Sequence, residues 1–303
     1  MTSGERDAAA SAPERVDPWT IRRVLTWATQ DFAARGLASP GLEAELLLAH
    51  ALAVPRIRLI ADNQRVLSPP ELQSLRALIQ RRRSGEPSAY ILGRREFYGL
   101  DFQVDSRVLI PRPDTETLIE VALRRTASQS LFAQVLDLCT GSGCVAIALG
   151  HARTTWRIIA ADISNDALDV ARNNALRLGE AHHVAFVHSD LFAALSDQRF
   201  DVITCNPPYI GSAEISALPV DVRDFEPRLA LDGGDDGLQL IRKIVPQARR
   251  HLNPGGLLAM EVGAGQAPAV SDLFAENGFA AIELQRDYGG HQRVVSATTP
   301  QEP

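Results

Sequence analysis

Four consecutive residues, Asn206-Pro207-Pro208-Tyr209, follow directly on an apolar run that ends at Cys205. Two adjacent prolines cannot donate backbone hydrogen bonds to a neighbouring strand, and their rings fix the backbone φ angle at two positions. The side-chain oxygen of Asn206 and the carbonyl oxygen of Pro207 can each accept one N–H of a planar amino group, while the ring of Tyr209 stacks on its plane. The tetrapeptide therefore has the parts needed to orient a poorly nucleophilic –NH2 group.

A second group of residues suited to binding lies earlier in the chain. The turn Cys139-Thr140-Gly141-Ser142-Gly143 follows an apolar run and is followed by a helical pattern. Glycines let the backbone of such a turn approach a ligand, and the start of the helix offers free N–H groups. Asp162 ends the next apolar run, where a carboxylate can accept hydrogen bonds from both hydroxyls of a ribose. These residues indicate a ligand that contains a nucleoside.

The turn by itself leaves three interpretations open. The stretch Gly141-Ser142-Gly143-Cys144-Val145-Ala146 matches the G-x-G-x-x-[GA] dinucleotide fingerprint, with Asp162 about 20 residues further on, as that fingerprint requires. An NAD-dependent oxidoreductase is one interpretation, a different nucleoside ligand is the second, and a glycine turn with only a structural role is the third.

The residues after Cys205 separate these interpretations. In open α/β sheets, ligands bind outside the carboxyl ends of the strands, so Gly141 and Asn206 are expected to face one crevice. A site for hydride transfer does not need Asn-Pro-Pro-Tyr. A site that transfers a methyl group to a planar nitrogen does need such residues, because they orient the nitrogen. A Pro-Pro turn is also common in loops that have no functional role. Here, however, it is expected beside the glycine turn and Asp162, which favours a functional role. Methyl transfer is therefore favoured.

The elements that must position these residues form an alternating pattern. Apolar runs at 134–138, 157–163, 183–190, 200–205 and 256–262 are separated by helix-like stretches such as 166–178 and 237–252. Strands buried on both faces that alternate with helices predict an α/β fold with a doubly wound, mostly parallel sheet. The tail reads as two further strands around Gly289-Gly290, which makes seven strands in a domain spanning 111–298.

The N-terminal part is expected to fold separately. Residues 1–18 are small, charged and proline-containing, and predict a disordered lead. Residues 19–90 show helical periodicity and predict a small helical domain that recognises substrate, and 91–110 predict a β-hairpin connector around Gly99. The apolar positions expected to face the core of the helical domain include Ile21, Val24, Leu25, Ala28, Leu42, Leu46, Leu47, His50, Leu72, Leu75, Leu78 and Ile79.

Composition restricts the class of protein. The chain has 303 residues, a net charge of -6 and a pI near 5.7, which argues against a protein whose main task is to grip nucleic-acid phosphates. Arg81-Arg82-Arg83 is either a local basic patch or the solvated end of a helix. The three cysteines lack paired metal-site spacing, so no metal is expected. The odd number of cysteines fits a reducing cytoplasm, and with no signal peptide or apolar span we expect a protein that is neither secreted nor membrane-embedded. We further expect a monomer.

Longer segments give a resemblance to a known family. The chain closely resembles the bacterial release-factor N5-glutamine methyltransferases over about 87–296. The Asn-Pro-Pro-Tyr motif is shared with DNA adenine and RNA guanine methyltransferases, whereas 110–116 distinguishes the release-factor enzymes from a sister family that methylates a ribosomal-protein glutamine. The segments that carry the resemblance are "PSAYILGRREFYGLDFQVDSRVLIPRPDTETLIE" (87–120), "LDLCTGSG" (136–143), "CNPPYI" (205–210), "DVRDFEPRLAL" (221–231) and "RDYGGHQRV" (286–294).

The resemblance implies a class I S-adenosylmethionine methyltransferase fold, and it implies roles for particular residues. S-adenosylmethionine would be bound by 139–143, with Asp162 on the ribose, Asp190 and Leu191 toward the adenine, and Asn206 between cofactor and substrate. The glutamine of a Gly-Gly-Gln loop of a class I peptide chain release factor would be held by Asn206, Pro207, Pro208 and Tyr209, with Phe97 as a wall. No nucleic-acid or membrane partner is implied.

Two residues depart from the family pattern. Cys139 stands where family members usually carry glycine, and Leu191 stands where an aromatic residue often follows the acid and would stack on adenine. We interpret the cysteines as small packing residues. The alternatives that remain are a glutamine methyltransferase of a ribosomal protein, a nucleic-acid amino methyltransferase, an oxidoreductase, and a binding module without activity.

Overall fold

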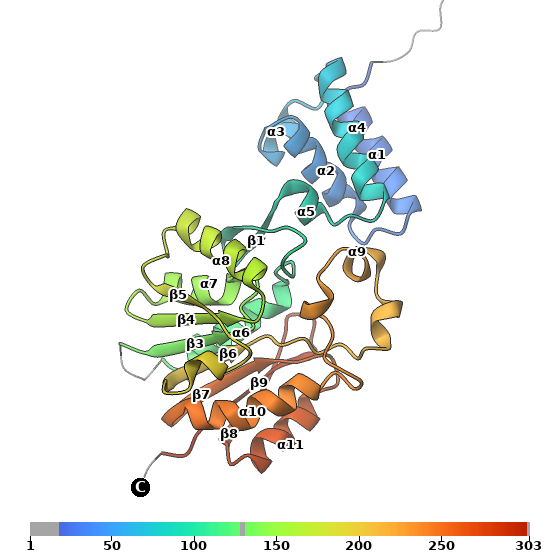
Figure 1. Cartoon of the computed structure of the whole chain (residues 1–303). Helices are drawn as coiled ribbons and strands as arrows, with labels where there is room; N and C mark the ends of the chain where they lie inside the picture. The colour runs from blue at the N-terminus through green and yellow to red at the C-terminus, as the bar shows by residue number, and fades with distance from the viewer. Residues whose placement is uncertain (1–17, 128–130, 302–303) are drawn as a thin grey trace, which may run out of the picture. The chain divides into compact units, whose positions relative to one another are not determined.

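The computed structural model describes residues 18–127 and 131–301, and these fall into two compact units that divide after Ser84. The lead expected at 1–18 lies outside the described residues, apart from Pro18. In the first unit, Thr20 and Ser68 are the N-caps of α1 and α4. The Thr20 hydroxyl accepts a hydrogen bond from Arg23 N, and Ser68 forms a capping box with Glu71. The helices of this unit are α1 (Ile21–Ala34), α2 (Pro40–Ala51), α3 (Arg56–Ala61) and α4 (Pro69–Arg83) (Figure 1).

The core of the first unit follows the predicted helical period with one local difference. Ile21, Val24 and Ala28 of α1 are buried, as expected. In α2, however, Leu42 is 43% exposed and His50 is exposed. The buried face of this helix is instead made by Ala44, Leu47, Leu48 and Ala49. The apolar run in α2 surrounds the helix, so its period alone did not identify the buried side.

The arginine run at the end of α4 joins helices to one another. Arg82 is 8% exposed and donates to Glu43 of α2 at 3.0 Å. Arg83 donates to both carboxylate oxygens of Asp31 in α1, at 2.8 and 2.7 Å. For the buried Arg82, both the basic-patch and the solvated-end interpretations are therefore wrong, whereas Arg83 is exposed as a helix end would be but also pairs with Asp31.

The second unit is a three-layer α/β structure around a seven-stranded sheet, as predicted (Figure 1). The strand order is β5-β4-β3-β6-β7-β9-β8, and β9 runs in the opposite direction to the other six strands of this sheet. The strands are β3 (Gln134–Leu138), β4 (Arg157–Asp162), β5 (Val184–His188), β6 (Phe200–Cys205), β7 (Leu252–Glu261), β8 (Ala280–Arg286) and β9 (Gln292–Thr298).

Successive residues of the central strands point into two different cores. Val135 and Leu257 pack in the core that contains α6 and α7, whereas Leu136 and Leu258 pack in the core that contains α10 and α11. Strands buried on both faces therefore read as continuous apolar runs in the sequence. The helices of the layers are α6 (Glu116–Arg125), α7 (Cys144–Ala152), α8 (Asn165–Leu178), α10 (Gln239–His251) and α11 (Ala267–Glu276).

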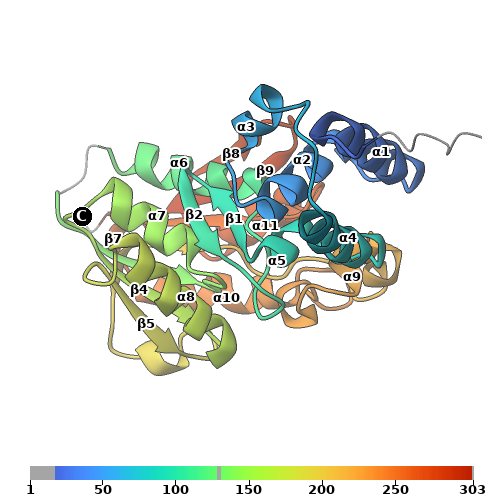
Figure 2. The same cartoon turned by 90° about the horizontal axis from the view of Figure 1, so that it is seen from above.

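The expected hairpin is present as β1 (Arg94–Phe97) and β2 (Leu100–Gln103), which pair antiparallel next to α8 (Figure 2). Its two turn residues, Tyr98 and Gly99, both have positive φ, as a type I′ hairpin turn requires. The shorter elements of the unit are α5 (Ser88–Leu92), α9 (Val220–Arg223) and the 3-10 turns Pro113–Thr115, Ala193–Leu195, Glu214–Ala217 and Arg228–Ala230.

Candidate active site

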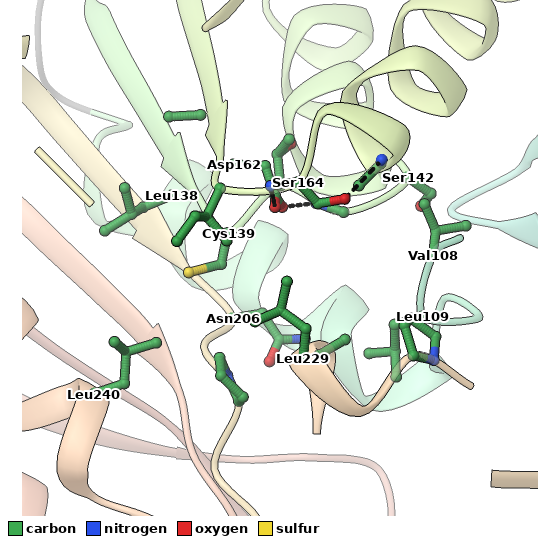
Figure 3. A pocket seen from close by; sticks show the side chains of 18 of the residues that line it. Val108, Leu109, Leu138, Cys139, Ser142, Asp162, Ser164, Asn206, Leu229 and Leu240 are labelled. Carbon is green, nitrogen blue, oxygen red and sulfur yellow. Dashed lines mark hydrogen bonds between the residues drawn. The ribbon is translucent and has the colours of Figure 1, made fainter. Parts of the chain in front are cut away.

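The sheet order brings the two predicted motifs together. β3 and β6 are parallel neighbours at the point where the strand order reverses, and Leu138 pairs with Cys205. The chain leaves both strands at the same edge, so the turn at 139–143 and the tetrapeptide at 206–209, called here the acceptor loop, begin side by side. A cavity of ≈ 260 Å³ opens there, and both Cys139 and Asn206 line it (Figure 3).

The glycines of the first turn have different roles. Gly141 has a φ of +55°, and a Cβ atom built on it would meet no atom within 4 Å, so its backbone faces open space in the cavity. A Cβ on Gly143 would instead lie 3.0 Å from Ile147 and 3.1 Å from Ala171. Gly141 therefore leaves room for a ligand, whereas Gly143 allows α7 to pack closely on α8.

Two carboxylates line the cavity beside this turn. Asp162 accepts hydrogen bonds from the backbone N–H groups of Gly141 and Ser164, both at 2.9 Å, and burial raises its pKa. Asp137 accepts from the hydroxyls of Thr140 (2.6 Å) and Thr204 (2.8 Å), and burial raises its pKa to about 6. Each carboxylate oxygen has a further lone pair, so the pair suits hydroxyl donors and a cationic group.

The acceptor loop is fixed from behind by side chains of other elements. Asn206 Nδ2 donates to Thr115 Oγ1 at 3.3 Å, which leaves the side-chain oxygen of Asn206 for a ligand. The Tyr209 hydroxyl donates to Glu261 Oε1 at 3.1 Å, and burial raises the pKa of the tyrosine. Gln266 Nε2 donates to the backbone oxygen of Tyr209 at 2.8 Å.

The segment 231–237 closes around the acceptor loop, and we call it the clasp. Ile210 N donates to Leu231 O at 3.0 Å, and Gly233 N donates to Ile210 O at 2.8 Å. The clasp can lie this close because it carries glycines. A Cβ on Gly233 would lie 2.8 Å from the Cα of Tyr209, and one on Gly237 would lie 2.2 Å from the backbone oxygen of Tyr209.

An ion pair ties the segment before α6 to the segment before the clasp. Arg112 lines the cavity and bonds to Glu226, whose second oxygen accepts from Ile110 N at 3.3 Å. Burial raises the pKa of Glu226, and the guanidinium of Arg112 opposes this shift. The pair links two segments that are far apart in the sequence and that both carry the family resemblance, 110–116 and 221–231.

Comparisons with known proteins agree with this geometry. Residues 23–93 match the family model described as the PrmC N-terminal domain, and residues 115–218 match the methyltransferase small domain. A release factor glutamine methyltransferase of Geobacter sulfurreducens is 45% identical over 282 residues, which cover 93% of this chain and 98% of the relative. One of Moorella thermoacetica is 42% identical, covering 93% and 100%.

The chain belongs to the release factor glutamine methyltransferase family. Among solved structures, a methyltransferase of Pyrococcus furiosus matches with a TM-score of 0.50 at 19% identity, covering 67% of this chain and 91% of that one. This likeness concerns the fold, and the class I S-adenosylmethionine methyltransferase architecture expected from the sequence is confirmed.

Most site residues expected from the family resemblance lie at the cavity, but four do not. Gly143, Pro207 and Tyr209 are adjacent to it without lining it. Phe97 is 1% exposed and packs edge-to-face on Phe102 in the core. The expected residues that line the cavity are Cys139, Thr140, Gly141, Ser142, Asp162, Asp190, Leu191, Asn206 and Pro208.

The two departures from the family pattern share a backbone feature. Cys139 has a φ of +59° and Leu191 a φ of +49°, in the left-handed region that glycine adopts without strain. Glycine at position 139 in other family members fits this conformation. The side chain of Cys139 packs against the core that contains Cys205, and Cys144 is buried in the other core, in agreement with a packing role.

Several residues of the site were missed by sequence reasoning. Asp137 lies two residues before the glycine turn, and its position at the end of a buried strand was a usable signal. Arg112 and Thr115 lie in the segment 110–116, which the family resemblance marked without giving either residue a role. Glu261 reaches the site from β7, and nothing local in the sequence marks it. The described residues contain no cluster of three or more His, Cys, Asp or Glu side chains arranged to hold a metal ion. None of their helices combines the length and apolar character of a membrane span.

Proposed function

We propose that this protein transfers a methyl group from S-adenosylmethionine to the side-chain amide nitrogen (N5) of the glutamine in the Gly-Gly-Gln motif of class I peptide chain release factors. The observation that carries the proposal is the placement of Asn206. Its side-chain nitrogen donates a hydrogen bond to Thr115 Oγ1, which leaves its side-chain oxygen to accept an N–H of the substrate. Asn206 lines the same cavity as the turn at Gly141. Release factors act on the ribosome, so we place the enzyme in the cytoplasm.

The cavity has the donor and acceptor groups that S-adenosylmethionine needs. Asp162 would accept the ribose hydroxyls, Asp137 would face the cationic amino-acid part, and the open space at Gly141 would admit the ligand to the backbone. Asp190 and Leu191 line the cavity where the adenine is expected. Bound S-adenosylmethionine supplies a methyl group made electrophilic by its sulfonium.

The acceptor loop would supply orientation. The amide nitrogen of glutamine is a poor nucleophile because its lone pair is delocalised. The Asn206 side-chain oxygen and the Pro207 carbonyl accept its two N–H groups, Pro208 completes the rigid turn, and the ring of Tyr209 stacks on the amide plane. After transfer, the protonated amide is acidic enough to lose its proton to water, so no general base is required.

Methyl transfer from labelled S-adenosylmethionine to three purified acceptors tests the proposal. We expect label on a class I release factor, and none on a glutamine-containing ribosomal protein or on adenine-rich DNA. Label on the ribosomal protein or DNA alone would support one of the two runner-up functions. Tight NAD binding without methyl transfer would support the oxidoreductase.

Replacement of Asp162 by alanine tests the cofactor site. Charge-assisted hydrogen bonds contribute ~1.5–3 kcal/mol each, so Asp162→Ala is expected to weaken S-adenosylmethionine binding by about 10- to 1000-fold. Calorimetry measures this directly. Asp169→Ala, which removes an exposed carboxylate of α8, serves as the control and should leave the affinity unchanged. Equal affinities for the parent and Asp162→Ala would refute the assignment.

We further propose that the helical unit recognises the body of the release factor. Several large apolar side chains are exposed on it, among them Ile57 (67%) and Ile60 (68%), which lie three residues apart on α3. Residues at this spacing share a helix face. Such a face is suited to contact a folded protein.

The double variant Ile57→Ser/Ile60→Ser is expected to raise KM for the intact release factor by about tenfold, which is the cost of losing a modest contact. Its kcat and its affinity for S-adenosylmethionine should not change, because the cavity is built by residues of the other unit. Leu176→Ser on α8, where the side chain is also 68% exposed, is the matched control. An unchanged KM for the double variant would remove α3 from the recognition surface.

A further inference from the structure

Glu261 is a buried acid that the proposed function does not use. It is the last residue of β7, it is 1% exposed, and it does not line the cavity. One carboxylate oxygen, Oε1, accepts from the Tyr209 hydroxyl at 3.1 Å. The other, Oε2, has no hydrogen-bond partner of ordinary geometry among the described residues. A carboxyl group this buried is costly unless it is well paired, so its presence needs a reason.

The neighbours of Glu261 are the supports of the acceptor loop. Besides Tyr209, the Thr115 hydroxyl lies near the Glu261 carboxyl group and favours the charged form of that group. The hydroxyl and the carboxyl group do not form a hydrogen bond of ordinary geometry. Thr115 in turn accepts from Asn206 Nδ2 at 3.3 Å. The Glu261 carboxyl group therefore contacts Tyr209 directly and lies next to Thr115, which holds Asn206, and Tyr209 and Asn206 are the two side chains that would orient the acceptor.

The donor and acceptor properties of these groups determine which way the Thr115 hydroxyl and the Asn206 amide are oriented. A carboxylate only accepts hydrogen bonds, so a hydroxyl that faces it presents its O–H there. The lone pairs of Thr115 Oγ1 are then available to Asn206 Nδ2. An asparagine whose nitrogen is held in this way must turn its oxygen toward the cavity, which is the orientation that an incoming N–H group needs.

We propose that Glu261 is a positioning residue of the acceptor site, which fixes the Tyr209 ring directly and the Asn206 amide through Thr115. The proposal rests on the proposed function, since it concerns how the acceptor glutamine is held. A purely structural role would be served better by an uncharged residue of similar shape at this position.

The electrostatic surroundings of Glu261 support a role beyond folding. Burial raises its pKa to about 7, although Thr115, Arg293 on β9 and Tyr209 act to lower it. Asp114, before α6, and the Cys144 thiol of α7 also face it. The folded-state pKa lies above the ordinary value of 4.5, so the contribution of this group to stability is fully present below 4.5 and is lost as the pH rises through 7. The enzyme thus holds the charged form at a cost to its stability.

Glu261→Gln is the first test, since glutamine keeps the shape but removes the charge and replaces one acceptor oxygen by an NH2 donor. We expect kcat to fall about tenfold, with KM for the release factor and the affinity for S-adenosylmethionine unchanged. The unfolding temperature of the variant at pH 8 should be at or above that of the parent. The parent's kcat should fall as the pH drops below 7, while the kcat of Glu261→Gln should stay low and flat over that range.

Tyr209→Phe is the second variant, and it keeps the proposal testable if Glu261→Gln does not fold. It should lower kcat by several-fold, and the double variant should be no slower than Glu261→Gln alone, because the two residues act through one contact. The controls are Tyr288→Phe and Glu120→Gln, which break an exposed tyrosine–glutamate hydrogen bond of 2.6 Å and should leave kcat unchanged.

Three results would overturn the proposal: full kcat in Glu261→Gln, additive losses in the double variant, or a parallel loss of stability and cofactor affinity, which would indicate a structural role. The parent enzyme, assayed alongside, separates the two claims. If the parent fails to methylate the release factor, the proposed function is wrong, whereas an active parent with an equally active Glu261→Gln refutes only the role of Glu261.

Discussion

Replacing Asn206 by alanine is expected to lower kcat by ~10²–10³, the loss seen when one preorganised polar group is removed from an active site. The variant loses the oxygen that would accept an N–H of the glutamine, while Thr115, its partner behind the loop, remains in place. S-adenosylmethionine affinity should change little. Single-turnover methylation of a release factor measures the effect on the transfer step.

Asn206→Asp sharpens this prediction. It keeps an acceptor oxygen but adds a negative charge beside the sulfonium, where ground-state attraction opposes transfer, so it should be slow as well. Asn277→Ala is the matched control, because that asparagine is also half-buried and its Nδ2 also makes one hydrogen bond, to Leu273 O at 2.8 Å. A fully active Asn206→Ala would contradict the account of the acceptor site.

Gly237→Ala is the second substitution with a large expected effect. The added methyl group would lie 2.2 Å from the backbone oxygen of Tyr209 and 2.6 Å from Gln266 Nε2, the two atoms joined by the hydrogen bond that holds the acceptor loop. The loop or the clasp must therefore shift. A misplacement of about 1 Å at a reacting group costs roughly 10² in rate, so kcat should fall by at least that factor.

Gly278→Ala separates the clash from backbone strain. Gly278 has a φ of +74°, almost the +73° of Gly237, but a Cβ there would meet nothing within 4 Å. Both substitutions carry the strain of a left-handed alanine, about 1 kcal/mol. Only Gly237→Ala should lose activity at a temperature where both variants are folded, as judged by circular dichroism. Equal loss of activity in the two would show that the clasp does not position the loop.

The sequence allowed the second unit to be predicted well because its strands are buried on both faces. Runs such as 134–138 and 200–205 coincide with β3 and β6, and the switch-point rule then predicted that Gly141 and Asn206 face one cavity. The residues at 206–209 already favoured methyl transfer to a planar nitrogen, and the family resemblance added the identity of the cofactor and of the acceptor.

What the sequence could not show was the direction of individual side chains. Gly143 and Gly141 look alike in the motif, but one faces α8 and the other the cavity. Phe97 is an aromatic residue near the right segment, yet the pleat of the hairpin turns it into the core. Such choices depend on neighbours from distant segments, and no local pattern records them.

The supports of the acceptor loop were missed for the same reason. Glu261 lies 52 residues after Tyr209, and Thr115 lies 91 residues before Asn206. An acid at the end of a strand has no distinctive spacing, and a threonine at the start of a helix has an ordinary explanation as a cap. Their significance emerges only when the sheet places β7 beside β6.

The most direct test of the account is to locate the transferred methyl group. A class I release factor is incubated with the enzyme and labelled S-adenosylmethionine, digested, and sequenced by tandem mass spectrometry, beside a substrate in which the glutamine of Gly-Gly-Gln is replaced by alanine. The account predicts one methyl group on the side-chain amide of that glutamine, and no label on the alanine substrate. Label elsewhere on the factor, or equal label on both substrates, would contradict it.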